Sequence, residues 1–134
     1  RSDIPLDFPI KPVSKMGGPI YEFQFFVYQD AKNGNWWLEI GANYTILGFW
    51  PQRIFQGLYD SGSYVACGGE AFRPANTGRP HMGTGYFPKT EAREYNAYCQ
   101  DMLVVDKQHK IVYADDYTEE FTSDMTHYAA SQEG

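Results

Sequence analysis

Short segments in which apolar and polar residues alternate with a period of two recur along this chain, while helical periodicity is nearly absent. This alternation is the signature of β-strands. In residues 20–28, for example, Tyr21, Phe23, Phe25 and Val27 fall on one face of a strand. The chain is therefore predicted to be all-β, and its repeated short strands favour an antiparallel sandwich or barrel over a βαβ architecture.

The strand and turn signals can be placed on the sequence. Asn and Gly in residues 31–35 supply the turn of a clear hairpin, because both tolerate positive φ, and residues 107–109 form a second predicted turn. Pro51 is expected at the first position of a short helical turn within 52–58. Strands are predicted at 20–28, 36–40, 44–50, 64–72, 95–105 and 110–114.

Size and charge limit the possible functions. A chain of 134 residues is the size of one domain, and we assign residues 1–114 to the β domain and 115–134 to a polar C-terminal tail. The net charge of −6 without a basic stripe argues against a nucleic-acid partner. No apolar run is long enough to cross a membrane, and no phosphate loop or zinc-type Cys/His spacing occurs. We therefore expect no nucleic-acid or membrane partner, no cofactor and no metal.

The cysteines and one sequon bear on the cellular compartment. Cys67 and Cys99 lie in two predicted strands, and a disulfide between them would stabilise the fold by about 3 to 4 kcal/mol in the chain-entropy model. Two free, buried thiols are the alternative interpretation. The tripeptide at residues 43–45 makes Asn43 a candidate glycosylation site and favours secretion.

Four motifs taken together resemble a known family. They are Gly34-Asn35-Trp36-Trp37-Leu38, Leu47-Gly48-Phe49-Trp50-Pro51, Cys67-Gly68-Gly69-Glu70 and Met82-Gly83-Thr84-Gly85. In this order and spacing they resemble the neprosin domain of plants, whose pattern has a Trp-Trp-Leu strand, a Gly-aromatic-Trp-Pro corner, a Gly-Gly-Glu strand and a Met-Gly-Ser-Gly loop. The resemblance extends to about Val105 and corresponds to the second half of that domain.

The resemblance implies a secreted sandwich of two antiparallel sheets and a glutamic endopeptidase, active in acid, that cleaves after proline. Its mechanism uses two glutamates, of which one matches Glu70 and the other lies N-terminal to every residue present here. This chain departs from the family pattern at Cys67, where Trp is common, and at Thr84, where the family has Ser. Thr84 retains a hydroxyl, whereas Cys67 changes the packing beside the predicted site.

Two carboxyls are needed because peptide hydrolysis requires one group to accept a proton from water and another to stabilise or protonate the oxyanion and the leaving amine. Glu70 could fill either role, or could be a solvated strand glutamate. Glu39, Asp101 and Asp106 are candidates for the second carboxyl, although nothing in their spacing favours any of them. Strand alternation predicts an aromatic, partly apolar setting for Glu70.

Several other side chains are candidates for substrate binding. Tyr64, Tyr86 and Trp50 could contact proline rings through their aromatic faces, although core packing is the commoner fate of such residues. His81, beside the glycine loop, could assist catalysis or bind a substrate carboxylate, although isolated loop histidines are usually just exposed.

Three functions remain open from the sequence. The first is a peptidase chain whose second catalytic Glu lies on a companion chain, with a peptide as substrate. The second is a non-catalytic plant binding or defence protein, lectin-like, that closes its sheets as a homo-oligomer. The third is a storage or structural protein. A secreted, extracellular or vacuolar location is expected.

Overall fold

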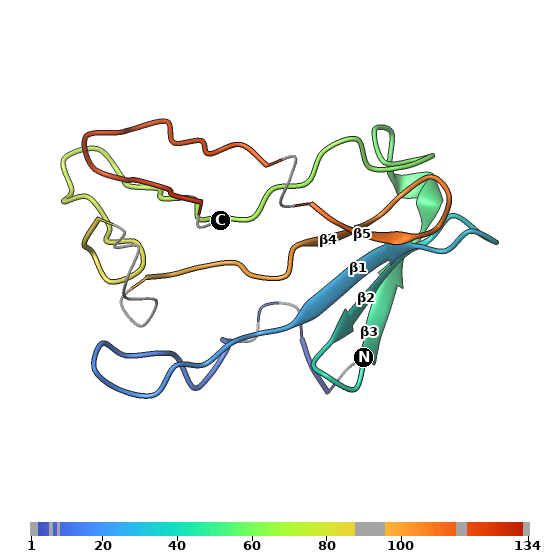
Figure 1. The fold of residues 1–134 in the computed structure, drawn as a ribbon, viewed down its shortest axis with the longest axis horizontal. Helices are drawn as coiled ribbons and strands as arrows, with labels where there is room; N and C mark the ends of the chain where they lie inside the picture. Colours follow the sequence, from blue (N-terminus) through green and yellow to red (C-terminus); the bar gives the residue numbers. More distant parts are fainter. Residues whose placement is uncertain (1–2, 6, 8, 88–95, 115–117, 133–134) are drawn as a thin grey trace. The chain divides into compact units, whose positions relative to one another are not determined.

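The computed structural model describes residues 3–5, 7, 9–87, 96–114 and 118–132 (Figure 1). The chain forms two compact units. Unit 1 comprises Arg1–Ser14 and Pro19–Val65, and unit 2 comprises Lys15–Gly18 and Ala66–Gly134. Each unit carries one antiparallel sheet in its described part.

Unit 1 is built on a three-stranded antiparallel sheet with the strand order β1-β2-β3 (Figure 1). The strands are β1 (Phe25–Gln29), β2 (Trp36–Ile40) and β3 (Thr45–Trp50). The register pairs Tyr28 with Trp37 across β1 and β2, and Trp37 with Phe49 across β2 and β3. The β2–β3 register shifts between Leu38 and Glu39. These rings lie on one face, where Trp37 and Phe49 have centroids 4.9 Å apart.

The β1–β2 turn forms where the sequence predicts it. Asp30 accepts hydrogen bonds from the backbone N–H of Lys32 at 2.9 Å and from Asn33 Nδ2 at 2.6 Å. Gly34 adopts a φ of +70° and donates its N–H to the Asp30 carbonyl at 2.7 Å. Asn35 N–H donates to Asn33 Oδ1 at 2.9 Å. The short polar side chains therefore replace the ladder hydrogen bonds that end at this turn.

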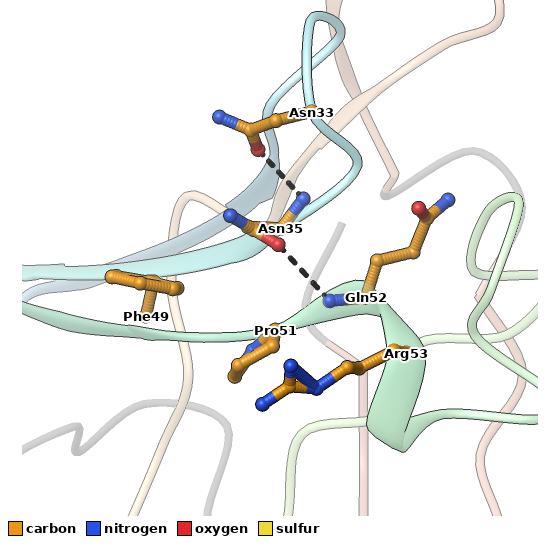
Figure 2. A pocket seen from close by; sticks show the side chains of 6 residues that line it. All are labelled: Asn33, Asn35, Phe49, Pro51, Gln52 and Arg53. Carbon is orange, nitrogen blue, oxygen red and sulfur yellow. Dashed lines mark hydrogen bonds between the residues drawn. The ribbon is translucent and has the colours of Figure 1, made fainter.

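A short 3-10 helix, η1 (Gln52–Ile54), follows β3. The sequence predicted a helical turn here, but the structure differs in two respects: the helix ends at Ile54, and Pro51 is its N-cap, extended at φ −60° and ψ 135°, not its first helical residue. The Gln52 N–H donates to Asn35 Oδ1 at 3.1 Å (Figure 2). A side chain from the β1–β2 turn thus replaces a local N-cap.

Side-chain donors fix the segment after η1 to the sheet of unit 1. Trp36 Nε1 donates to the Leu58 carbonyl at 2.8 Å. Gln29 Nε2 and Gln52 Nε2 both donate to the Tyr59 carbonyl at 2.8 Å. Because these carbonyls lie outside regular structure, the three hydrogen bonds provide partners that a strand or helix would otherwise supply.

Unit 2 contains a hairpin of β4 (Leu103–Val105) and β5 (Ile111–Tyr113). Its turn is the predicted one at 107–109, and Asp106 Oδ1 accepts the N–H groups of Gln108 and Lys110 at 2.8 and 2.9 Å. The predicted 95–105 strand is reduced to its last three residues in the described part of the chain.

The prediction of a strand at 64–72 was wrong, because the structure assigns no strand there. Alternation identifies side chains suited to a sheet, but a strand forms only where a neighbouring strand accepts and donates its backbone hydrogen bonds. Gly68 and Gly69 also reduce the side-chain contacts that would hold such a pairing.

The described residues include very little buried apolar surface. Ala114, at 7% exposed, is the one buried hydrophobic residue among them, whereas Tyr64 and Phe72 are each 83% exposed. A stable domain of this size normally buries most of its large apolar side chains. The all-β class is confirmed, and two antiparallel sheets are consistent with a sandwich.

Candidate functional site

The glycine-rich motifs of unit 2 lie against each other. A Cβ placed on Gly69 would collide with the terminal methyl of Met82, so the backbone beside Glu70 touches the Met82 side chain. Residues 82–85 form a tight turn in which Gly85 N–H donates to the Met82 carbonyl at 2.9 Å. The structure therefore brings together two of the motifs that carry the family resemblance.

A third segment joins them. The Cys67–Cys99 disulfide is present, as predicted, and its Cα atoms are 6.4 Å apart. A Cβ on Gly83 would lie 3.3 Å from both Ala97 Cβ and Ala97 N. Segment 67–70, the 82–85 turn and segment 97–99 are thus connected by one covalent bond and by close contacts at Gly69 and Gly83. Glycine is needed at 83, because φ there is +55° and the space for a side chain is restricted.

Glu70 is exposed at the edge of this arrangement. Tyr64 and Phe72 do not form the expected aromatic setting, since each is 83% exposed in the described part of the chain. The physical reason is the missing strand: without a ladder, residues 64, 66, 70 and 72 share no face.

His81 packs against the glycine turn. A Cβ on Gly85, whose φ is +81°, would lie 2.5 Å from His81 Nδ1. The residues before His81 contact the C-terminal tail: Arg79 forms a salt bridge with Asp124, and Tyr128 Oη donates to the Pro80 carbonyl at 3.0 Å. The tail thus holds the segment that carries His81.

Asp124 is the centre of that tail contact. Its carboxylate accepts Thr126 Oγ1 at 2.6 Å and lies 3.0 Å from His127 Nδ1, in addition to pairing with Arg79. The hydrogen bond from Thr126, with those of His127 and the Arg79 charge, holds the pKa of Asp124 well below its usual range. Sequence reasoning missed this cluster, although the Asp-x-Thr-His spacing at 124–127 is a signal for a local capping turn.

Two carboxyls that were weighed as partners for Glu70 have other roles. Asp106 caps the β4–β5 turn, as described above. Glu39 lies half-buried on β2 and accepts a hydrogen bond from Tyr28 Oη at 3.0 Å. Partial burial, with the hydrogen bond to Glu39 and the Glu39 charge, raises the pKa of Tyr28.

Comparison with known proteins decides the family. The neprosin family model matches residues 1–134, the whole chain. The chain belongs to the neprosin family. No solved structure matches it. The family membership predicted from the four motifs is therefore confirmed.

The remaining candidates of this neprosin chain are divided between the units. Trp50 is half-buried at the end of β3, directly opposite Trp36 on β2, which fits a packing role. Tyr64 belongs to unit 1, whereas Tyr86, at 73% exposed, belongs to unit 2 with Glu70. Asn43 lies in the exposed β2–β3 turn, where a glycan could be attached without disturbing the sheet. Their substrate-binding and glycosylation roles stay predictions.

The described residues of the chain contain no candidate metal centre and no candidate membrane-spanning helix. No three His, Cys, Asp or Glu side chains in that part are grouped as metal ligands. No helix within the same residues is long and apolar enough to cross a bilayer.

Proposed function

We propose that this chain is part of a glutamic peptidase of neprosin type, in which Glu70 supplies one catalytic carboxyl and a companion chain supplies the other. The observation that carries the proposal is the contact between the Gly68–Gly69–Glu70 segment and the Met82–Gly85 turn. Family membership gives the lineage. The contact gives Glu70 a fixed backbone frame, braced by the Cys67–Cys99 bond.

The reaction follows from two carboxyls in different protonation states. The ionised carboxyl accepts a proton from water as the water oxygen adds to the peptide carbonyl carbon. The protonated carboxyl stabilises the oxyanion and passes its proton to the leaving nitrogen when the C–N bond breaks. One water is consumed, an acid and an amine form, and the carboxyls exchange roles. Acidic conditions keep one carboxyl protonated, which fits an acid-active enzyme.

The companion chain is supported by the uncovered apolar side chains. Tyr64, Phe72 and Phe121 are more than four-fifths exposed. Exposing apolar surface to water is unfavourable in free energy, and a partner surface that covers these side chains would remove that penalty. A companion half-domain with its own carboxyl would cover these apolar side chains and would also complete the catalytic pair of carboxyls. The proposed location is outside the cell or in the vacuole, which the Cys67–Cys99 disulfide supports, and Asn43 is the proposed glycosylation site.

The experiment measures hydrolysis of a proline-containing peptide at acidic pH by the native material, with its intact mass taken under denaturing, non-reducing conditions. A second chain and an activity abolished by Glu70→Gln are expected. Glu119→Gln is the matched control, because Glu119 is an exposed glutamate of the same unit with no described contact to the motifs. Retained activity in Glu70→Gln would move the site elsewhere.

A non-catalytic, lectin-like binding protein is the second candidate, and the exposure of Glu70 and Tyr86 favours it. It predicts a homo-oligomer of the 134-residue chain and no hydrolysis at any pH. A single chain species without activity would select this function over the peptidase.

A further inference from the structure

A hollow of about 460 Å³ in unit 1 takes no part in the site around Glu70 (Figure 2). It is lined by Asn33, Asn35, Phe49, Pro51, Gln52 and Arg53. These residues come from the β1–β2 turn, the end of β3 and η1. Figure 2 shows the Arg53 side chain running back from η1 alongside Pro51.

Two free polar groups of this hollow are hydrogen-bond donors, namely Asn35 Nδ2 and the Arg53 guanidinium, and Gln52 Oε1 is an acceptor. Asn35 Oδ1 accepts the Gln52 N–H at 3.1 Å, and this fixes which side-chain atom of Asn35 is oxygen, so Nδ2 is the remaining one. Asn33 Oδ1 already accepts the Asn35 N–H at 2.9 Å. Within the described residues, neither Asn35 Nδ2 nor the Arg53 guanidinium has a hydrogen-bond partner. The hollow therefore offers a positive charge and amide N–H groups.

Two of the residues that line the hollow are apolar, Phe49 and Pro51, and Phe49 is 49% exposed. A guanidinium binds a carboxylate through two parallel N–H groups, and an aromatic ring packs on an aliphatic or pyrrolidine body. The two asparagine oxygens already accept backbone N–H groups, which leaves Gln52 Oε1, in the described part of the chain, as the side-chain oxygen free to accept. The charged Arg53 donor therefore favours an anion over a neutral sugar.

We propose that this hollow binds the free C-terminal carboxylate of a peptide whose last residue is apolar, with Arg53 and Asn35 holding the carboxylate and Phe49 the side chain. The choice of proline as last residue rests on the proposed function, because cleavage after proline leaves that terminus. The hollow is a binding site and needs no carboxyl chemistry of its own.

The test is an amide-detected NMR titration of the full chain with N-acetyl-L-proline, N-acetyl-L-prolinamide and galacturonate. The free acid is expected to shift the backbone signals of Asn35 and Gln52 with a Kd on the order of 1 mM, typical of a ligand this small. The prolinamide, which lacks the negative charge, is expected to bind at least roughly tenfold more weakly.

Variants separate this site from general charge effects. Arg53→Gln is expected to weaken binding of the acid roughly tenfold or more, because one charge-assisted pair is lost. Lys32→Gln is the matched control: it removes an exposed positive charge of the neighbouring turn that does not line the hollow, and it should leave binding unchanged. Glu70→Gln should also leave binding to the hollow unchanged. A failure of the proposed peptidase function can therefore be distinguished from a failure of the proposed binding site.

Equal binding of the acid and the prolinamide would overturn the proposal, and so would unchanged binding in Arg53→Gln. Tighter binding of galacturonate than of the peptide acid would assign the hollow to acidic sugars and would overturn the peptide assignment.

Discussion

Substitution of Gly34 by alanine tests how the β1–β2 turn, η1 and the segment after it are held together. Gly34 has a φ of +70°, and a Cβ there would fall on the Gln52 side-chain amide, 2.6 Å from its Oε1. That amide donates to the Tyr59 carbonyl at 2.8 Å. The added methyl therefore strains the backbone and also displaces Gln52 from its hydrogen bond.

Gly41→Ala is the matched control, because Gly41 has the same φ of +70° and nothing within 4 Å of the added Cβ. A left-handed alanine costs about 1 to 2 kcal/mol, and this cost is common to both variants. Losing the Gln52 hydrogen bond adds about 0.5 to 1.5 kcal/mol for Gly34→Ala alone. We expect Gly34→Ala to lower the free energy of unfolding by about 1.5 to 3.5 kcal/mol, and Gly41→Ala by about 1 to 2 kcal/mol.

The assay is urea unfolding followed by tryptophan fluorescence, since Trp36 donates to the Leu58 carbonyl in the same segment. A double-variant cycle isolates the contact: in a Gln52→Ala background, Gly34→Ala should cost no more than Gly41→Ala. Equal costs of the two glycine variants in the wild-type background, or an unchanged cost of Gly34→Ala in the Gln52→Ala background, would refute the reasoning.

Three further predictions follow from the contacts. The pKa of Asp124 is lowered, so its contacts in the tail are fully present above the ordinary carboxyl pKa of 3.8 and are lost as the pH falls from 3.8 toward the lowered pKa. The backbone amides of the tail should therefore exchange faster only below about pH 4. Asp124→Asn should remove this pH dependence. Replacing Cys67 and Cys99 together by serine should lower the free energy of unfolding by about 2 to 4 kcal/mol, measured by urea unfolding without reductant. Glu39→Gln should lower the pKa of Tyr28 toward 10.0, followed by ultraviolet titration of the phenol; an unchanged pKa would show that burial alone raises it.

Local signals account for what the sequence predicted well. Strand β2 has the predicted bounds, Trp36–Ile40, because alternation there coincides with an Asn-Gly turn that fixes its start. The turn at 107–109 was found for a similar reason, with Asp106 capping it. In both places the alternating segment lies next to the turn residues in the sequence, so the strand on the other side of the turn is available to pair with it.

Contacts between distant residues account for what the sequence did not reveal. The Arg79–Asp124 salt bridge spans 45 residues and the Asn35–Gln52 hydrogen bond spans 17, and no periodicity connects their partners. The 64–72 segment failed as a strand for the same reason, since its alternation carries no information about a pairing partner.

Glu70 shows where motif and structure give different information. The motif identifies its position in the family, and the structure sets its backbone beside Met82 and the disulfide. The proposed hydrolysis requires a second carboxyl, which neither the motif nor the described residues identify, and Tyr64 and Phe72, expected around Glu70, are exposed. The proposed companion chain would answer both observations, because it would supply an acidic group and cover the exposed apolar side chains. A partner that covers the apolar side chains without a carboxyl would leave Glu70 inert, so activity and assembly must be measured together.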